Sequence, residues 1–278
     1  MYNSAVIFQK MAKRFCSNFR MFPLRTAIAN NFHPIKFNSV VLAIRTVVDM
    51  LLTDFIYNHC ISSHKKERVG LAVCQGEDPF SWAKNFACER MVLLAQQPDA
   101  GPACGFAAAF AGRIAQAANP SIPLHGSVLS GFAGVSPALS ESQIDAYVQA
   151  GICPLEYAAG NVEIIRAVTS RVTREDSTPD RTFQELSTVL TMDRVMVSLR
   201  ESLESLLQGS RNNARTQASL ATQAGVVLQS HQADGLIDSY QRPRAYTDET
   251  DPAVCIVEVS FVISRGMNQI RVAAHIQI

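Results

Sequence analysis

Two stretches of the sequence have the residue types of ligand-binding or catalytic loops but lack the required spacing. GLAVCQGEDPF, residues 70–80, follows an apolar run and precedes a helical pattern, which is where phosphate-binding loops lie. It contains neither GxGxxG nor GxxxxGK, and its two carboxylates would repel a phosphate. HGSVLSGFAG, residues 125–134, contains Ser127 and Ser130, but neither serine has the flanking glycines of a nucleophile elbow. We therefore expect neither a nucleotide site nor a serine nucleophile.

Cysteine, histidine and carboxylate side chains also give no strong signal for catalysis or metal binding. Cys104 and His125 could form a thiol–imidazole pair, but Cys104 begins an alanine-rich helical pattern, where small residues more often serve close packing. His275 falls on the polar face of a predicted strand, which favours a surface position. Carboxylates at 248, 249 and 251 are typical of a solvated acidic loop. We expect no catalytic residue, no metal site and no cofactor.

Charge is distributed unevenly along the chain. The sequence has 278 residues, of which 47% are hydrophobic, enough for a packed core, and its net charge of +1 indicates no nucleic-acid partner. Residues 1–66 carry nine Lys or Arg and two Asp or Glu, whereas residues 67–278 carry sixteen and twenty-two. We therefore expect residues 1–66 to be a basic leader that packs poorly against a domain at 67–278.

The composition of the first forty residues leaves the cellular targeting of the protein open. The first forty residues are basic and free of acidic residues, a composition similar to that of a mitochondrial transit peptide. A rearranged leader fused to the following domain fits equally well. The best candidate for a membrane span, residues 40–57, is interrupted by Arg45, Asp49 and Asp54, each costly inside a bilayer, so we expect no membrane insertion. The seven cysteines show no CxxC spacing, which favours buried, reduced thiols.

Apolar runs alternate with helical patterns in the first part of this domain. Runs at residues 68–74 and 91–95 predict two buried strands. Between them, Asp78 can cap a helix that has Pro79 at its first position, and residues 102–118 predict a helix rich in small residues. This alternation predicts a small α/β layer with parallel strands.

The next segments predict a hairpin and several helices. Ser140 and Gln143 have the spacing of a capping box, for a helix that ends near Gly151. Residues 158–161 have the composition of a hairpin turn, followed by a strand from 162 to 168.

Two long helices are expected after the hairpin. Thr182 and Glu185 predict a second capping box that opens a helix over residues 183–207, and residues 213–237 predict another. Apolar residues at helical spacing form a stripe on the first of these helices, which we expect to face the hairpin and the closing strands. The stripe comprises Phe183, Leu186, Leu190, Met196, Leu199, Leu203 and Leu206.

The chain closes with two strand-like segments, about 254–264 and 268–278, which follow a linker at 241–252. In the last segment apolar residues alternate with others, which predicts a strand with one buried face. A strand at the end of a chain offers unpaired amides and carbonyls, a template for strand addition between chains. The residues expected to form this inter-subunit strand are Ile270, Val272, Ala274, Ile276 and Ile278.

These elements together predict an α/β (α+β) fold. We expect a small strand–helix layer, then a β-hairpin, two long helices and a C-terminal antiparallel strand pair.

Three segments, in this order, resemble the C-terminal half of contractile-tail sheath proteins, which form the outer tube of myophages, phage-tail-like bacteriocins and related injection devices. They are VEIIRAVTS at 162–170, FQELSTVLTMDRVMVSLRESLES at 183–205 and VEVSFVISRGMNQIRVAAHIQI at 257–278. The resemblance runs from about residue 67 to the end. Residues 1–66 match nothing in the family, which implies a truncated or rearranged N-terminus, as in a prophage gene.

The resemblance implies a structural sheath subunit, not an enzyme. Such a subunit polymerises around a tail tube through strands shared between subunits, and contracts to drive the tube through a cell envelope. The implied partners are other sheath subunits, the tail tube protein, and baseplate and tail terminator proteins. The implied location is a virion tail or phage-tail-like particle, assembled in the bacterial host cytoplasm.

Two other functions stay open from the residues alone. One is a small α/β enzyme or ligand-binding domain with a site at the loop 119–139, which is rich in Pro and Gly. The other is a mitochondrially targeted protein, which would be cleaved within about the first forty residues.

Overall fold

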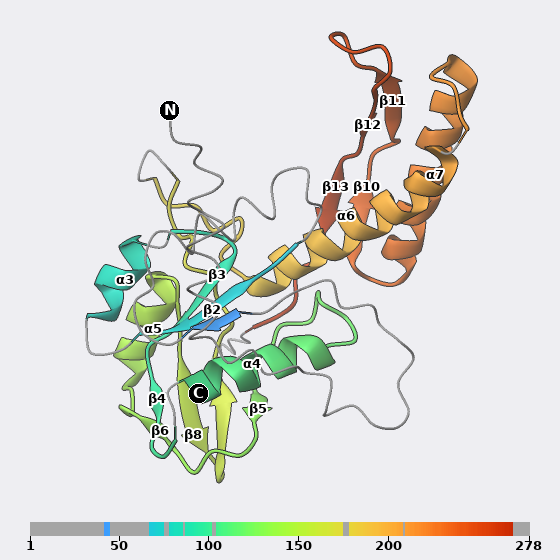
Figure 1. Cartoon of the computed structure of the whole chain (residues 1–278). Helices are drawn as coiled ribbons and strands as arrows, with labels where there is room; N and C mark the ends of the chain where they lie inside the picture. Colours follow the sequence, from blue (N-terminus) through green and yellow to red (C-terminus); the bar gives the residue numbers. More distant parts are fainter. Residues whose placement is uncertain are drawn as a thin grey trace, which may run out of the picture. The chain divides into compact units, whose positions relative to one another are not determined.

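A parallel sheet forms the centre of the first part of the fold (Figure 1). The computed structural model of the chain describes residues 42–44, 67–74, 78–85, 87–101, 104–174, 178–207 and 209–268. The sheet has the order β1 (Leu42–Ile44), β2 (Gly70–Val73), β3 (Met91–Leu94) and β7 (Ile152–Cys153), and each neighbouring pair is parallel. The expected parallel pairing of the two buried runs is therefore confirmed. β1 belongs to the segment expected to be a leader; the domain boundary at residue 66 stays a prediction.

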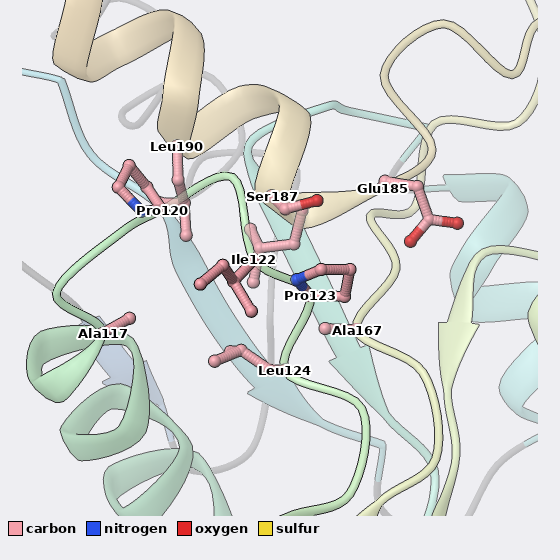
Figure 2. A pocket seen from close by; sticks show the side chains of 10 residues that line it. Ala117, Pro120, Ile122, Pro123, Leu124, Ala167, Glu185, Ser187 and Leu190 are labelled. Carbon is pink, nitrogen blue, oxygen red and sulfur yellow. The ribbon is translucent and has the colours of Figure 1, made fainter. Parts of the chain in front are cut away.

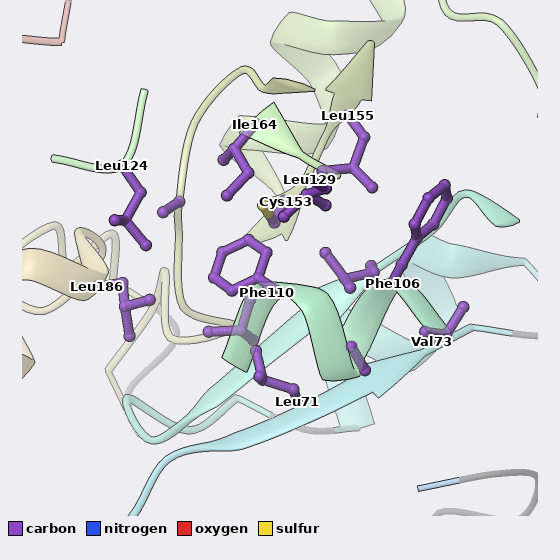
Figure 3. Close-up of a cluster of buried hydrophobic side chains, with 14 of the residues drawn as sticks. Leu71, Val73, Phe106, Phe110, Leu124, Leu129, Cys153, Leu155, Ile164 and Leu186 are labelled. Carbon is purple, nitrogen blue, oxygen red and sulfur yellow. The ribbon is translucent and has the colours of Figure 1, made fainter. Parts of the chain in front are cut away.

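Both faces of this sheet are buried, which explains why its strands are continuous apolar runs. On β2, Leu71 and Val73 face a large core with Phe106 and Phe110 of α4 (Cys104–Gln116), as Figure 3 shows. Ala72, on the opposite face, belongs to a smaller core. Helices α3 (Pro79–Asn85) and α5 (Glu141–Gln149) contribute to that smaller core.

The caps predicted for these two helices are confirmed. The Phe80 amide donates to Asp78 Oδ1 at 3.1 Å. Ser140 and Gln143 form a reciprocal capping box at the start of α5. Gly151 follows α5 at φ +78°, and a Cβ there would lie 2.7 Å from the Thr169 carbonyl oxygen, so only glycine fits.

The predicted hairpin is present beside the large core. β8 (Leu155–Ala158) pairs with β9 (Asn161–Ile164), which also pairs with β5 (Ser127–Leu129), all antiparallel. β9 ends at Ile164, so the predicted extension to residue 168 is wrong. A short ladder of β4 (Gln97–Pro98) and β6 (Val135–Ser136) lies nearby.

The first long helix starts later than predicted. α6 spans Leu186–Leu207 and α7 spans Ala214–Ala233. The capping box at Thr182 does not form, because the residues before α6 bond to another segment: the Thr169 amide donates to the Gln184 carbonyl, and the Leu186 amide to that of Ala167. The Glu185 carboxylate accepts from Arg166 instead of returning to the backbone of Thr182.

The prediction of a linker at residues 241–252 is wrong in part, because this segment contains a strand. β10 (Ile237–Tyr240) and β11 (Arg244–Thr247) pair with β13 (Phe261–Ile263) and β12 (Cys255–Glu258), respectively, antiparallel. We call this hairpin, residues 237–263, the terminal ribbon. The expected pairing of segment 254–264 with 268–278 lies largely outside the described residues. Within the described residues, the first segment pairs with residues 237–247.

A third core joins the two helices to the terminal ribbon. α6 and α7 pack against each other, and the ribbon packs on α7 (Figure 1). Leu199 of α6 is 4% exposed and packs with Leu228 of α7 and Ile237 of β10. Leu186 of the same helix belongs to the large core. The apolar stripe therefore faces the hairpin at its start and the terminal ribbon further along, as predicted.

Candidate assembly site at the terminal ribbon

Helix α7 provides the base on which the ribbon is built. Asn213 caps its start by accepting the Thr216 amide at 3.0 Å. At its end, Gly235 adopts φ +71° and the Leu236 amide bonds to the His231 carbonyl, which turns the chain directly into β10. Burial of Leu236 and Ile237 fixes the start of the ribbon on the helix.

The ribbon is continuous although β10 and β11 are separate strands. The Gln241 amide donates to the Ser260 carbonyl at 2.8 Å between the two ladders. At the tip, the Asp248 amide donates to the Val254 carbonyl at 3.0 Å. Asp248 Oδ1 also accepts the amides of Thr250 and Asp251, and these bonds lower the pKa of the Asp248 carboxyl. The predicted acidic loop is thus a hairpin turn whose first carboxylate bonds to backbone.

Both outer edges of the ribbon carry backbone groups without a strand partner in the described part of the chain. Each strand of the ribbon has a single strand neighbour there. Because hydrogen-bonded pairs alternate in antiparallel ladders, the bond at Asp248 places Tyr246 in a bonded pair with Ile256. The amides of Ala245 on β11 and of Cys255 on β12 therefore point outward, one at each edge.

The two faces of the ribbon differ in burial. Val257, Val259 and Phe261 pack on the helices. On the other face, Tyr246 is 44% exposed and Val262 is 55% exposed. A strand added at either edge would extend this sheet. The apolar side chains of the added strand would lie on the same face as Val257, Val259 and Phe261.

The residues predicted to form the inter-subunit strand lie outside the described part of the chain. These are Ile270, Val272, Ala274, Ile276 and Ile278. The structure describes the chain up to Asn268, five residues after β13, so their role as an assembly strand stays a prediction.

Ion pairs hold α6 in place beneath the ribbon. Arg90, next to β3, donates two bonds to Asp193 of α6, at 2.8 and 2.7 Å, and both side chains are largely buried. Seven residues further along α6, Arg200 pairs with Glu67. This spacing is two helical turns, so both pairs lie on one face of α6. They connect the helix that supports the ribbon to the parallel sheet.

The first half of the loop 119–139, proposed above as an alternative ligand site, lines a very small cavity. Figure 2 shows Pro120, Ile122, Pro123 and Leu124 of this loop beside Leu190 of α6. The cavity measures about 10 Å³, close to the minimum of about 10–15 Å³ that a single water needs. This cavity is therefore too small for a small-molecule ligand. The other end of the loop, at Ser136 and Pro137, borders an open surface hollow of about 380 Å³.

The other candidates for chemistry either have structural partners or lie outside the described residues. His125 Nδ1 lies 2.6 Å from the Ile165 carbonyl oxygen. The Cys104 side chain lies outside what the structure describes. Burial raises the pKa of the Cys74 thiol to about 12, and the side chains of Cys74, Cys88 and Cys153 are buried, as expected. Among the described residues, no group of three His, Cys, Asp or Glu is arranged to hold a metal ion.

No helix in the described ranges is long and apolar enough to cross a membrane.

Sequence reasoning missed the strands β10 and β11, which form one edge of the ribbon. Two signals in the sequence could have found them. Tyr246 and Thr247 are strand formers, and the following DETDP at 248–252 has the composition of a turn between two strands. Pro243 argued against a strand, but proline is tolerated where the ladder is interrupted.

Comparisons with known proteins identify the fold. No family model matches the sequence. No curated protein matches it either. Among solved structures, the sheath tail protein of Desulfitobacterium hafniense matches with a TM-score of 0.61 at 15% identity, over 82% of this chain and 57% of that one.

Two solved structures of the anti-feeding prophage also match. Its baseplate matches with a TM-score of 0.62 at 13% identity, over 80% of this chain and 63% of the matched one. Its helical sheath in the contracted state gives 0.64 at 14% identity, over 86% and 70%. This chain thus spans less than two thirds of the length of the first two proteins it matches. The expected resemblance is confirmed at the level of structure: the chain has the fold of contractile-tail sheath proteins.

Proposed function

We propose that this chain is a structural subunit of a contractile tail sheath. It polymerises around a tail tube by strand addition between subunits, and contraction of the polymer drives the tube through a cell envelope. The observation that carries this proposal is the terminal ribbon, whose two edges are open within the described residues and whose base is packed on α6 and α7. The shared fold with sheath proteins supports it.

The ribbon has the properties of an acceptor for strands. An isolated two-stranded sheet is marginal in water, but this one is held by a core that includes Leu199 and Leu228. Open edges on a stable base invite pairing with another chain. A strand bound there gains backbone hydrogen bonds along its length, and its apolar side chains extend the buried face.

The donor strand in this proposal is the end of the chain. Residues 270–278 alternate apolar and other residues, which suits pairing on a sheet with one covered face. Donor and acceptor on one polypeptide allow each subunit to link to the next in an open series.

Contraction, in this proposal, needs no bound nucleotide or metal. Subunits rotate and slide relative to one another while the strand links hold, and the free energy comes from the metastable extended polymer. The proposed partners are other copies of the chain, a tail tube protein, and baseplate and terminator proteins. The proposed location is a virion tail or phage-tail-like particle assembled in the bacterial cytoplasm. We propose no enzymatic activity.

Proline substitutions in the ribbon test the acceptor edges. Ala245→Pro and Cys255→Pro remove outward amides, so each should leave the monomer folded, and at least one should block polymerisation. The matched controls Tyr246→Pro and Ile256→Pro remove inward amides and should destabilise the ribbon itself. Circular dichroism measures folding, while sedimentation and negative-stain electron microscopy measure polymers. Tubes of normal length from both outward variants would refute strand addition at the ribbon.

Proline substitutions near the end of the chain test the donor. Val272 and Ala274 are two residues apart, so in a strand their amides point to the same edge. Val272→Pro and Ala274→Pro therefore remove amides from one edge. Arg271→Pro and Ala273→Pro remove amides on the other edge. We expect one of these two pairs to abolish polymers and the other to have less effect. Normal polymers from all four variants would show that the end of the chain is not the donor.

A further inference from the structure

Gly266, three residues after the terminal ribbon, lies against a loop of the first part of the fold. At Gly266, a Cβ atom would overlap Cδ and Cγ of Pro123 and would lie 2.9 Å from the Ser121 carbonyl oxygen. The backbone of Gly266 does not have the left-handed conformation that favours glycine. Glycine is therefore required here by contact alone, because any side chain would overlap a proline ring and a backbone oxygen.

The same loop also reaches the start of the ribbon. Ser121 is 7% exposed, and its Oγ lies 3.5 Å from the Gly235 carbonyl oxygen, just before β10. The two ends of the ribbon are joined to each other by the bond from the Ser264 amide to the Leu236 carbonyl, at 3.1 Å. The loop thus contacts the chain just before β10 and just after β13.

The loop has little freedom to move away. Pro120 and Pro123 each fix a backbone dihedral. Asn119 Oδ1 accepts both the amide of Ser121, at 2.9 Å, and its hydroxyl, at 2.7 Å. Leu124 is buried in the large core and anchors the end of the loop there (Figure 3). Because the loop is rigid, its contact with Gly266 can fix the position of the segment that follows the ribbon.

We propose that the loop 119–124 is a seat that sets where the terminal strand leaves the subunit, with Gly266 as the positioning residue. This inference rests on the proposed function, since it concerns the strand that would be donated. The ten residues after Asn268 span at most about 33–36 Å when extended. A strand of this length binds a neighbouring subunit well only if its first residue is held in place. If that residue moves freely, the effective concentration of the strand at the acceptor edge falls.

The first experiment measures the contact in the monomer by hydrogen exchange of the peptide 261–268. Gly266→Ala should accelerate exchange of the Ser264 amide at least tenfold, because the overlap pushes the segment off the loop. Gly112→Ala is the matched control, since a Cβ at Gly112 meets nothing within 4 Å, and it should change this rate less than twofold. Unchanged exchange in Gly266→Ala would overturn the seat.

A second pair of variants locates the contact partner. Pro123→Ala removes the two ring atoms nearest to position 266, so adding Gly266→Ala to Pro123→Ala should accelerate exchange less than threefold. A tenfold effect in both backgrounds would show that the proline ring is not the partner and would overturn the proposal.

The last measurement links the seat to assembly. Gly266→Ala should reduce the amount of sedimentable polymer at least tenfold, while the monomer still unfolds in a single thermal transition. The double variant Pro123→Ala, Gly266→Ala should recover part of the polymer. If Gly266→Ala frees the segment but polymers form normally, while proline substitutions within 271–274 block them, the seat does not position the strand and only this inference fails. If the unmodified chain and all variants fail to polymerise, the proposed function and the positioning role both fail.

Discussion

Truncation of Leu199 to alanine tests whether the ribbon and the parallel sheet depend on one shared helix. Leu199 lies on α6, is 4% exposed and packs with residues of α7 and β10. The substitution removes three buried carbon atoms, worth about 2.4 kcal/mol at about 0.8 kcal/mol each. The cavity left between secondary elements adds to this, so we expect the free energy of unfolding to fall by about 3–4 kcal/mol.

Two optical signals separate the regions of the molecule in this test. The chain has one tryptophan, Trp82 on α3, which packs against the smaller core of the parallel sheet. Far-UV circular dichroism is dominated by the long helices α6 and α7. Because α6 contributes Leu186 to the large core and Leu199 to the ribbon core, urea should unfold both regions together. Leu199→Ala should therefore lower both midpoints equally.

The matched control lies at the end of the same helix. Leu207 is 56% exposed, so Leu207→Ala should change the free energy of unfolding by less than about 0.5 kcal/mol. A loss below 1 kcal/mol in Leu199→Ala would refute its burial. A shift of the circular dichroism midpoint without a shift in Trp82 fluorescence would refute the coupling through α6.

Two further predictions concern buried polar groups. Burial, with a smaller contribution from Arg194, lowers the pKa of His231, and its ring nitrogens have no hydrogen-bond partner among the described residues. The folded state therefore favours the neutral imidazole. The contribution of His231 to stability is present above the unfolded pKa of about 6.5 and is lost as the pH falls below it. Urea midpoints should therefore drop between pH 7.5 and 5.5, and less so in His231→Leu; equal drops would contradict this. Asp193→Leu leaves Arg90 buried without its bidentate partner and should cost about 3–5 kcal/mol, whereas Arg90→Met with Asp193→Leu should recover most of it. A double variant as unstable as the single one would contradict the pair's role.

Local patterns in the sequence were sufficient for the parts of the fold that depend on local physics. The runs at 68–74 and 91–95 became β2 and β3 because strands buried on both faces need continuous apolar residues. The capping box at Ser140 formed because its two bonds lie within three residues of each other. The same spacing at Thr182 failed, since the adjacent backbone bonds to residues 167 and 169 instead.

The features of the candidate site that escaped prediction depend on contacts between distant residues. Arg90 and Asp193 are 103 positions apart, and no local pattern pairs them. Gly266 lies between the two segments predicted as closing strands, and its fit against Pro123 exists only after the chain has folded back. The strand β11 alternates exposed and half-buried residues, because one of its faces is exposed, and so it lacks a long apolar run.

The central position of α6 has a mechanical consequence for the proposed role as a sheath subunit. Its first turns pack in the large core, its middle carries the ion pair from Asp193 to Arg90, and its later turns support the ribbon. Close-packed cores and buried bidentate pairs resist gradual deformation. A force applied by a neighbour at the ribbon edge would therefore pass through α6 to the parallel sheet and move the described unit as a body. In the proposed polymer, bending during contraction would then occur between the described units, where strands are proposed to link them.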